Sequence, residues 1–393
     1  MKHSPSPIIS YLNSRKKNIL LFVICVILFV VAAVCAGHFE KTALISTEGQ
    51  SYEQATVTQI LQDNIQEDGN RYGSQTVVVR MRSGAYTGEE FEANSPSGTL
   101  FGADCTVGMK VIVIFSDSGD SQLVTVYSQD RSLAILGFVL FFALIVCLIG
   151  GRRGVMAIAS LAFTFLSVLY ILFPLIYRGA SPIGVTILVA MLVTLVTLGL
   201  LGGFTKKTAA AVCGTTLGVA IAGLSALAFG AAAGITGYNV SDIETLNYVG
   251  QYTNIRIGQL LFAGIILSSL GAVMDVGMSI ASTIQEIHEQ APTLSPRQLF
   301  LSGIHVGRDM MGTMTNTLIL AYVGSALSTL LIDYAYDLSV NQLLNSYVIG
   351  IEIMQGLSGS LGVVLTVPLT AFLATAFLTG KGLSGQRRGR AHS

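Results

Sequence analysis

Long runs of apolar residues, separated by short polar stretches, make up most of the chain. A helix needs roughly 20 mainly apolar residues to cross the hydrocarbon core of a bilayer, which is about 30 Å thick. Eight segments meet this requirement, namely residues 18–37, 133–149, 155–177, 182–203, 208–233, 257–281, 311–332 and 356–379. The pattern therefore predicts an α-helical polytopic membrane protein with about eight transmembrane helices.

One polar region, residues 38–131, interrupts this pattern between the first two apolar segments. Within it, short stretches rich in Val, Thr, Ile and Phe alternate with clusters of turn-forming residues, a pattern typical of strands joined by turns. The predicted strands span residues 54–61, 75–82, 89–93, 110–116 and 123–128. Five short strands in a region of this size predict a small β-barrel of the OB-like or SH3-like kind.

These patterns divide the chain into four parts. Residues 1–37 form a cytoplasmic N-terminus and the first transmembrane helix, and residues 38–131 form an extracytoplasmic β-rich domain. Residues 132–380 form a seven-helix membrane domain, and residues 381–393 form a basic cytoplasmic tail. The first apolar segment also resembles a secretory signal peptide, because basic residues precede it. Its length and the poor cleavage sequence at its end favour an uncleaved anchor.

The Lys and Arg residues of the loops predict the orientation, because cytoplasmic loops carry an excess of these residues. With a cytoplasmic N-terminus, 14 of the 22 basic residues lie inside and six lie in the β-rich domain. Only Arg178 and Arg256 then lie on short outer loops. The reverse orientation places the 14 outside. We therefore predict a multi-pass protein of the bacterial cytoplasmic membrane, with both termini in the cytoplasm.

The composition adds that the chain is poor in charge. Charged residues make up 11% of the sequence, against about 25% in soluble domains. The β-rich domain holds 13 of the 22 acidic residues and six of the 22 basic ones, a balance that disfavours nucleic acid as a partner. The five cysteines form no CxxC or Cys/His cluster, and no nucleotide-binding motif is present. We therefore expect neither a metal site nor a cofactor.

Ionisable residues interrupt the later apolar segments, where charge is costly and commonly marks a functional site. Asp275 lies in the sixth segment. Arg308 and Asp309 lie at the cytoplasmic start of the seventh, and Glu352 lies at the outer approach to the eighth. These positions predict that the last three segments carry the chemistry of the protein.

Helical spacing groups polar side chains around two of these carboxylates. Ser279 falls on the face of Asp275, while Thr313 and Asn316 fall on the face of Asp309. Two adjacent polar faces with an arginine nearby favour a buried ion-binding or proton-relay cluster. The candidate ion-binding or substrate-binding residues are Asp275, Ser279, Arg308, Asp309, Thr313, Asn316 and Glu352.

A structural interpretation of the same residues stays open. Arg308 and a neighbouring aspartate could form an ion pair that ties a cytoplasmic loop to the helix ends. Glu352 joins the cluster only if its helix is broken or re-entrant, and at a membrane interface it is solvated instead. The 42 glycines allow interrupted helices, but they are also common in ordinary helix-packing seams.

Three stretches of the later segments carry long motifs: GAVMDVGMSIAS at 271–282, SGIHVGRDMMGTMTNTLILAYVG within 302–325, and GIEIMQGLSGSLGVVLTVPLTA at 350–371. In these motifs the chain resembles the bacterial YibE/F-like family of multi-pass membrane proteins, and the resemblance runs over nearly the whole chain. It implies the multi-pass architecture with a single β-rich domain after the first span. It implies no biochemical activity and no catalytic residue.

These features favour a permease or transporter-like protein for a small solute or ion, with carboxylates in the membrane core. The alternative is a non-transporting membrane scaffold or sensor whose outer domain binds an envelope partner, either a protein or a glycan. An enzyme is not expected, because the His-Glu-x-x-His zinc motif and the Gly-x-Gly-Asp motif of aspartyl intramembrane proteases are absent. The one partner common to both hypotheses is the lipid bilayer.

Overall fold

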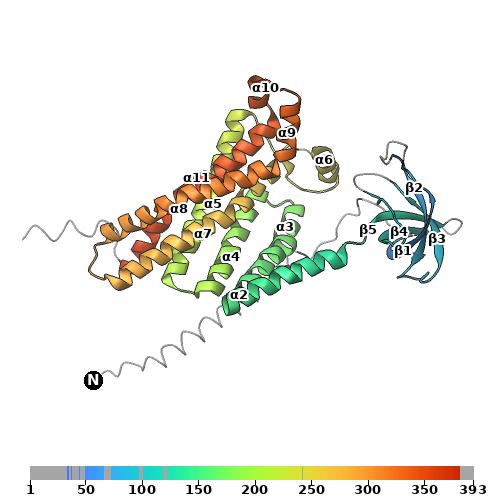
Figure 1. Ribbon diagram of the computed structural model, residues 1–393. Helices are drawn as coiled ribbons and strands as arrows, with labels where there is room; N and C mark the ends of the chain where they lie inside the picture. The colour runs from blue at the N-terminus through green and yellow to red at the C-terminus, as the bar shows by residue number, and fades with distance from the viewer. Residues whose placement is uncertain are drawn as a thin grey trace, which may run out of the picture. The chain divides into compact units, whose positions relative to one another are not determined.

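The computed structural model describes residues 33, 34, 37, 44, 49–65, 72–96, 101–117, 122–240 and 242–380. Most of the expected span 18–37 and all of the basic tail lie outside these residues. The chain divides into two compact units, one formed by residues 43–148 and the other by residues 1–42 and 149–393 (Figure 1). The first contains the strands, and we call the second the helical unit.

The strands form one closed barrel in the order β1-β2-β3-β5-β4, in which β4 pairs back onto β1. Strands β3 and β5 are parallel, and the other neighbours are antiparallel. This order is that of the OB-fold rather than of an SH3-like barrel. The five-stranded barrel predicted from the sequence is thus confirmed. Its strands are β1 (Gln50–Gln62), β2 (Gln75–Met81), β3 (Glu90–Ser95), β4 (Lys110–Asp117) and β5 (Gln122–Gln129).

Alternate side chains of each strand fill the barrel, as the two-residue period of a strand requires. In β2, Val77, Val79 and Met81 are buried, and they pack with the inward residues of the other strands. Gln75 is a buried polar residue among them. Its Oε1 accepts a hydrogen bond from the backbone N–H of Cys105 at 2.7 Å, and its Nε2 donates to the Cys105 carbonyl at 3.3 Å. The buried amide is therefore satisfied within the barrel.

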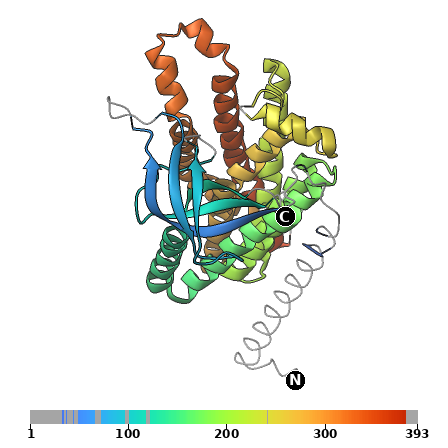
Figure 2. The same cartoon turned by 90° about the vertical axis from the view of Figure 1, so that its right-hand side faces the viewer.

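Helices make up the rest of the described chain. Helices α4, α5, α7, α8 and α11 run side by side in both views (Figures 1 and 2). The short helices α6 and α10 lie in connecting segments for which the sequence predicted no element. The helices are α2 (Ser132–Ser167), α3 (Phe173–Tyr177), α4 (Pro182–Gly202), α5 (Lys206–Ala233), α6 (Ile243–Tyr252), α7 (Leu260–Gln290), α8 (Pro296–Ser325), α9 (Leu327–Ala335), α10 (Val340–Leu344) and α11 (Tyr347–Thr379).

Five helical stretches of the described residues are long and apolar enough to cross a membrane, or six if α8 and α9 count as one bent span. The expected spans 133–149 and 155–177 form a single helical run, Ser132–Tyr177. The run is broken at Gly151, where φ is 53° and ψ is −130°, a conformation that glycine adopts most readily. The boundary expected between the two segments is therefore present as a break inside one run.

Small residues allow α5 to approach α7 and α11 closely. A Cβ atom added to Gly218 of α5 would overlap the side chains of Thr366 on α11 and Val273 on α7. A Cβ added to Gly214 would overlap Thr370 in the same way. Thr366, Thr370 and Val273 are fully buried. Small residues at such contacts bring helix backbones together, which is how helices associate in membranes.

Replacing Gly218 by alanine is expected to destabilise the helical unit, because overpacking a tight core costs about 1–3 kcal/mol. The matched control is Gly264→Ala in α7, where an added Cβ meets no atom within 4 Å. Alanine also favours helix over glycine there, so stability should be unchanged or slightly higher. Thermal unfolding of the two purified variants in detergent measures the difference. Equal melting temperatures would contradict the close packing of α5.

Candidate functional site

Asp275 lies on a polar face of α7. Helical spacing places it on the same face as Ser268 and Ser279, while Val276 and Ile280 of the same helix are buried in the core. Asp275 is exposed at the surface of the chain, and Ser279 is partly buried. Among the described residues, the Asp275 carboxylate has no hydrogen-bond or ion-pair partner.

Helix α8 carries a second polar face. Arg308, Asp309, Thr313 and Asn316 are all exposed on it, as the spacing of the last three predicted. The Thr313 hydroxyl bonds only to backbone carbonyls of its own helix, at 3.2 and 3.3 Å. The opposite face of α8 is buried and packs against α11 and α7 through small residues. Helix α8 therefore has a packing face on one side and a polar face on the other.

The start of α8 lies well before the polar face. Ser295 accepts a hydrogen bond from the backbone N–H of Gln298, and the Gln298 side chain accepts one from the backbone N–H of Ser295. This capping box, followed by Pro296, begins the helix. The sequence interpretation placed Arg308 and Asp309 at the start of the span. The structure instead places them near the middle of α8.

The two polar faces do not form one buried cluster. Neither Arg308 nor Asp309 makes an ion pair or a side-chain hydrogen bond with any residue that the structure describes. Asp275 is exposed as well. The direct polar link between the helices lies further along, where Ser268 Oγ and the Tyr322 hydroxyl are 2.6 Å apart. Asp275 and the polar residues of α8 thus lie on two different helices without a described link between them, and the role of each stays a prediction.

Glu352 lies in a different environment from the other carboxylates. It occupies the second turn of α11 and lines a cavity of about 280 Å³ between α8, α9 and α11. Its Oε2 atom is buried and has no hydrogen-bond partner among the described residues. The expectation was a solvated Glu352 unless its helix were broken. Instead α11 is continuous, and the carboxylate faces a cavity whose other walls are Ile319, Tyr322, Val323, Ala326, Leu330, Ile349, Ile353, Gly356 and Leu357.

The cavity lies at the break between α8 and α9, which are bent by 62° relative to each other. Ala326 and Leu330, at and beyond the break, both line it, and Tyr322 joins it to Ser268 of α7. The sequence interpretation missed Tyr322 and Ser268. Ser268 lies seven residues before Asp275, so the spacing that grouped Ser279 with Asp275 also contains it.

A larger cavity of about 570 Å³ lies between α2, α4 and α7. Its polar lining comes from Ser160, Thr164 and Thr197, and the Thr197 hydroxyl is buried without a hydrogen-bond partner. Gly271 of α7 forms part of its wall, and Asp275 lies one turn further along the helix. In the part of the chain that the structure describes, no group of three or more His, Cys, Asp or Glu residues is arranged to hold a metal ion.

The fold and these cavities define a class of protein, with apolar helices of membrane-spanning length and a small OB-type barrel. The family model described as "YibE/F-like protein" matches residues 138–380, more than half of the chain. The chain therefore belongs to the YibE/F-like family, as its motifs suggested. The match covers most of α2 and every later helix, and it leaves the barrel outside. No curated protein and no solved structure matches the chain.

The polar face of α8 predicts that water reaches the middle of this helix. We expect a cysteine at Asn316, in a chain whose native cysteines are replaced, to react with a membrane-impermeant maleimide, because the reactive thiolate forms in water. The matched control is a cysteine at Leu361, an exposed apolar position of α11, which should stay unlabelled in proteoliposomes. Equal labelling at the two positions would contradict a water-lined face.

Proposed function

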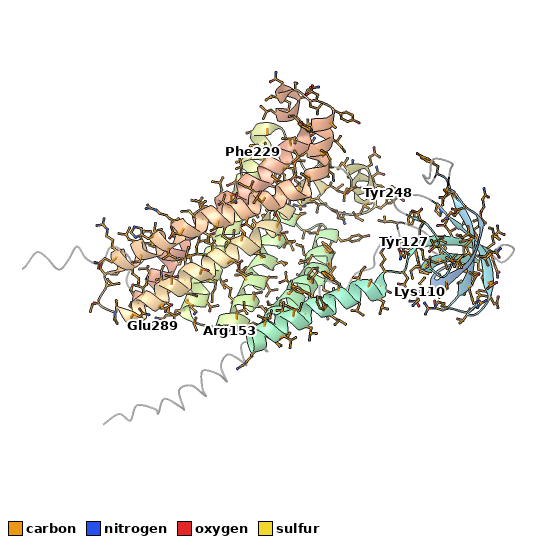
Figure 3. All side chains as sticks on the ribbon, viewed as in Figure 1. Lys110, Tyr127, Arg153, Phe229, Tyr248 and Glu289 are labelled. Atoms are coloured by element: carbon orange, nitrogen blue, oxygen red, sulfur yellow. The ribbon has the colours of Figure 1, made fainter. Side chains whose placement is uncertain are left out.

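We propose that this chain is an integral protein of the bacterial cytoplasmic membrane, with eight crossings and both termini in the cytoplasm. Five or six apolar stretches of the described residues support this proposal. Residues 18–37 supply one further crossing, and the two legs of α2 on either side of Gly151 supply separate ones. Arg153 and Glu289 lie at one end of the helical unit, and Phe229 and Tyr248 lie at the other (Figure 3). The Arg153 end is the cytoplasmic one.

The protein, in this proposal, transports a small solute or ion, and Glu352 is the group that binds it. The supporting observation is a carboxylate in an otherwise apolar cavity, with Oε2 buried and unpartnered. This oxygen has lost water without gaining a hydrogen bond from any described residue, which is costly. Binding a cation or a proton offsets that cost. Ionisable groups placed within membrane segments commonly mark ion pathways for this reason.

One residue of the polar face of α8, Arg308, lies on the side of the helix that lines this cavity. With about 100° between successive residues of a helix, Arg308 and Gly312 lie on the same side of α8 as Ile319, Val323 and Ala326. The last three line the cavity. In this proposal the substrate passes along this side of α8 between the Glu352 cavity and the cytoplasmic half of the helix. The break after α8 fits the same proposal, because interrupted helices are common at transporter sites.

Replacing Glu352 by glutamine is expected to abolish cation-coupled flux, because the change removes the charge and keeps the size of the side chain. Flux of candidate solutes into proteoliposomes, with and without a proton or sodium gradient, measures the effect. Glu244→Gln, at an exposed acid of α6, is the matched control and should leave flux unchanged. Asp275→Asn and Asp309→Asn are expected to reduce flux without abolishing it.

Two outcomes of this assay oppose the proposal. Equal flux through the Glu352 and Glu244 variants would remove the assigned role of Glu352. Absence of flux for every cation and solute tested, with the wild-type protein folded, would remove the transport function itself.

A second candidate function is a membrane scaffold or sensor whose barrel binds an envelope partner. Three aromatic side chains on the barrel surface favour it. The ring of Tyr127 lies 5.5 Å from that of Tyr52 and 5.3 Å from that of Phe101, measured between centroids. Tyr52 is 56% exposed and Phe101 is 48% exposed. Exposed apolar clusters of this kind mark interaction sites, and we call this one the aromatic platform.

The backbone holds the aromatic platform in place. The β4–β5 pairing shifts register between Ile112 and Val113, so that Tyr127 is the extra residue of a β-bulge in β5, a feature that re-aims side chains. The N–H of Gly102 donates to the Tyr127 carbonyl at 2.8 Å. Gly102 has φ +104° and its Cβ would overlap the Pro96 carbonyl, so a glycine is required beside Phe101. Rigid aromatic faces suit sugar rings or apolar side chains of a partner.

Replacing Tyr52 and Tyr127 together by alanine is expected to abolish binding of the full-length protein to purified envelope glycan or to an envelope protein in a pull-down assay. Tyr72→Ala, at a tyrosine that is 61% exposed and outside the aromatic platform, is the control. Unchanged binding by the double variant would contradict the assignment.

Deleting residues 42–128 separates the two candidate functions, because a transporter keeps its flux and a scaffold loses its function.

A further inference from the structure

Two consecutive arginines at the break in α2 line a cavity that neither proposed function uses. The cavity has a volume of about 350 Å³, and its walls are Arg152, Arg153 and Met156 of α2 and Leu200 and Leu201 of α4. Figure 3 shows Arg153 at the end of the helical unit where these two helices come together. The cavity therefore combines a cationic part with an apolar part, and we call it the arginine pocket.

Within the described part of the chain, no acidic residue balances the positive charge of the arginine pocket. Neither Arg152 nor Arg153 has an ion-pair or hydrogen-bond partner among the described residues. The pocket lining contains no acidic residue. A further cation lies at the same end of α4, because Lys207 Cε is 3.9 Å from the position that a Cβ would take at Gly202. Several cations without an internal counter-charge attract an anion from outside.

The break at Gly151 is what creates this arrangement. In a straight apolar helix, Arg152 and Arg153 would lie at membrane depth, where charge is costly. The break instead starts a new helical leg at this point, so Arg153 lies at the end of the helical unit, and Arg152 precedes it directly in the chain. The last turn of α4 brings its apolar side chains to the same place.

We propose that the arginine pocket binds an anionic phospholipid, with its phosphate on Arg152 and Arg153 and the start of an acyl chain along Met156, Leu200 and Leu201. The planar guanidinium fork matches phosphate oxygens in a bidentate manner. Basic pockets between helices at the cytoplasmic surface bind anionic lipid headgroups. A free phosphate would use the arginines but gain nothing from the apolar wall. The proposal rests on the membrane location proposed above and is independent of transport.

The test titrates the detergent-purified, delipidated full-length protein with short-chain phosphatidylglycerol, with phosphatidylcholine of the same chain length, and with inorganic phosphate. Binding is measured by native mass spectrometry and by the shift in melting temperature. We expect phosphatidylglycerol to bind and to stabilise the protein, while phosphatidylcholine and inorganic phosphate do so much less. Equal binding of the two lipids would overturn the proposal. If inorganic phosphate bound and stabilised the protein as well as phosphatidylglycerol does, the proposal that a lipid occupies the pocket would be overturned.

Variants test the residues. Arg152→Gln combined with Arg153→Gln is expected to weaken phosphatidylglycerol binding by about 30-fold, the effect of two cations near an anionic headgroup. Arg256→Gln combined with Arg297→Gln removes the same charge outside the pocket lining and should change the affinity little. Replacing both pocket arginines by lysine keeps the charge and should retain part of the phosphatidylglycerol binding. This variant tests the arginines even if the glutamine pair folds poorly. Equal affinity of the glutamine pair and the control pair would overturn the assignment.

Discussion

The close approach of α5 to α7 and α11 is the constraint on which the rest of the helical unit depends. At Gly214 and Gly218 there is no room for a Cβ, and buried threonines of α11 fill the space that a larger residue would need. Within a bilayer there is little hydrophobic gain from bringing apolar helices together, so such packing contacts decide which helices associate. Helix α8 then adds to α11 through Gly303 and Gly307, whose missing side chains leave room for α7 and α11 residues.

That packing determines which polar groups remain available. Because α8 uses its small residues to pack, Arg308, Asp309, Thr313 and Asn316 are left on its outer face. Asp275 lies on α7 beside the larger cavity, opposite a buried apolar face. Of the three candidate carboxylates, Glu352 alone lines the apolar cavity and has a buried oxygen without a hydrogen-bond partner among the described residues. The carboxylates therefore differ in environment, which is the physical reason for assigning ion binding to Glu352 first.

The sequence predicted most helices and strands well, but it predicted poorly which of their side chains lie close together. Apolar length and two-residue alternation are local properties, so the barrel strands and the helices α4, α5, α7 and α11 follow from them. The face shared by Asp309, Thr313 and Asn316 follows from helical spacing. Whether that face meets Asp275 depends on which side of α8 packs, and this is a tertiary property. The apolar pattern also began the seventh span at residue 311, whereas a capping box at Ser295 begins α8. Tyr322 was missed because the cavity that it lines is formed by the break between α8 and α9, which the apolar pattern does not predict.

The break between α8 and α9 and the buried carboxylate are parts of one feature. If α8 continued straight, each further residue would move 1.5 Å along its axis, and Leu330 would extend past Glu352 instead of lining the same cavity. Because of the bend of 62° between α8 and α9, Leu330 lines the same cavity as Glu352. The Tyr322 carbonyl at the end of α8 accepts hydrogen bonds from the Ala326 N–H and the Ser325 hydroxyl, so it is already satisfied. Glu352 is then the one charged residue among the described residues that line this cavity, and this is why the proposed cation site is assigned to it.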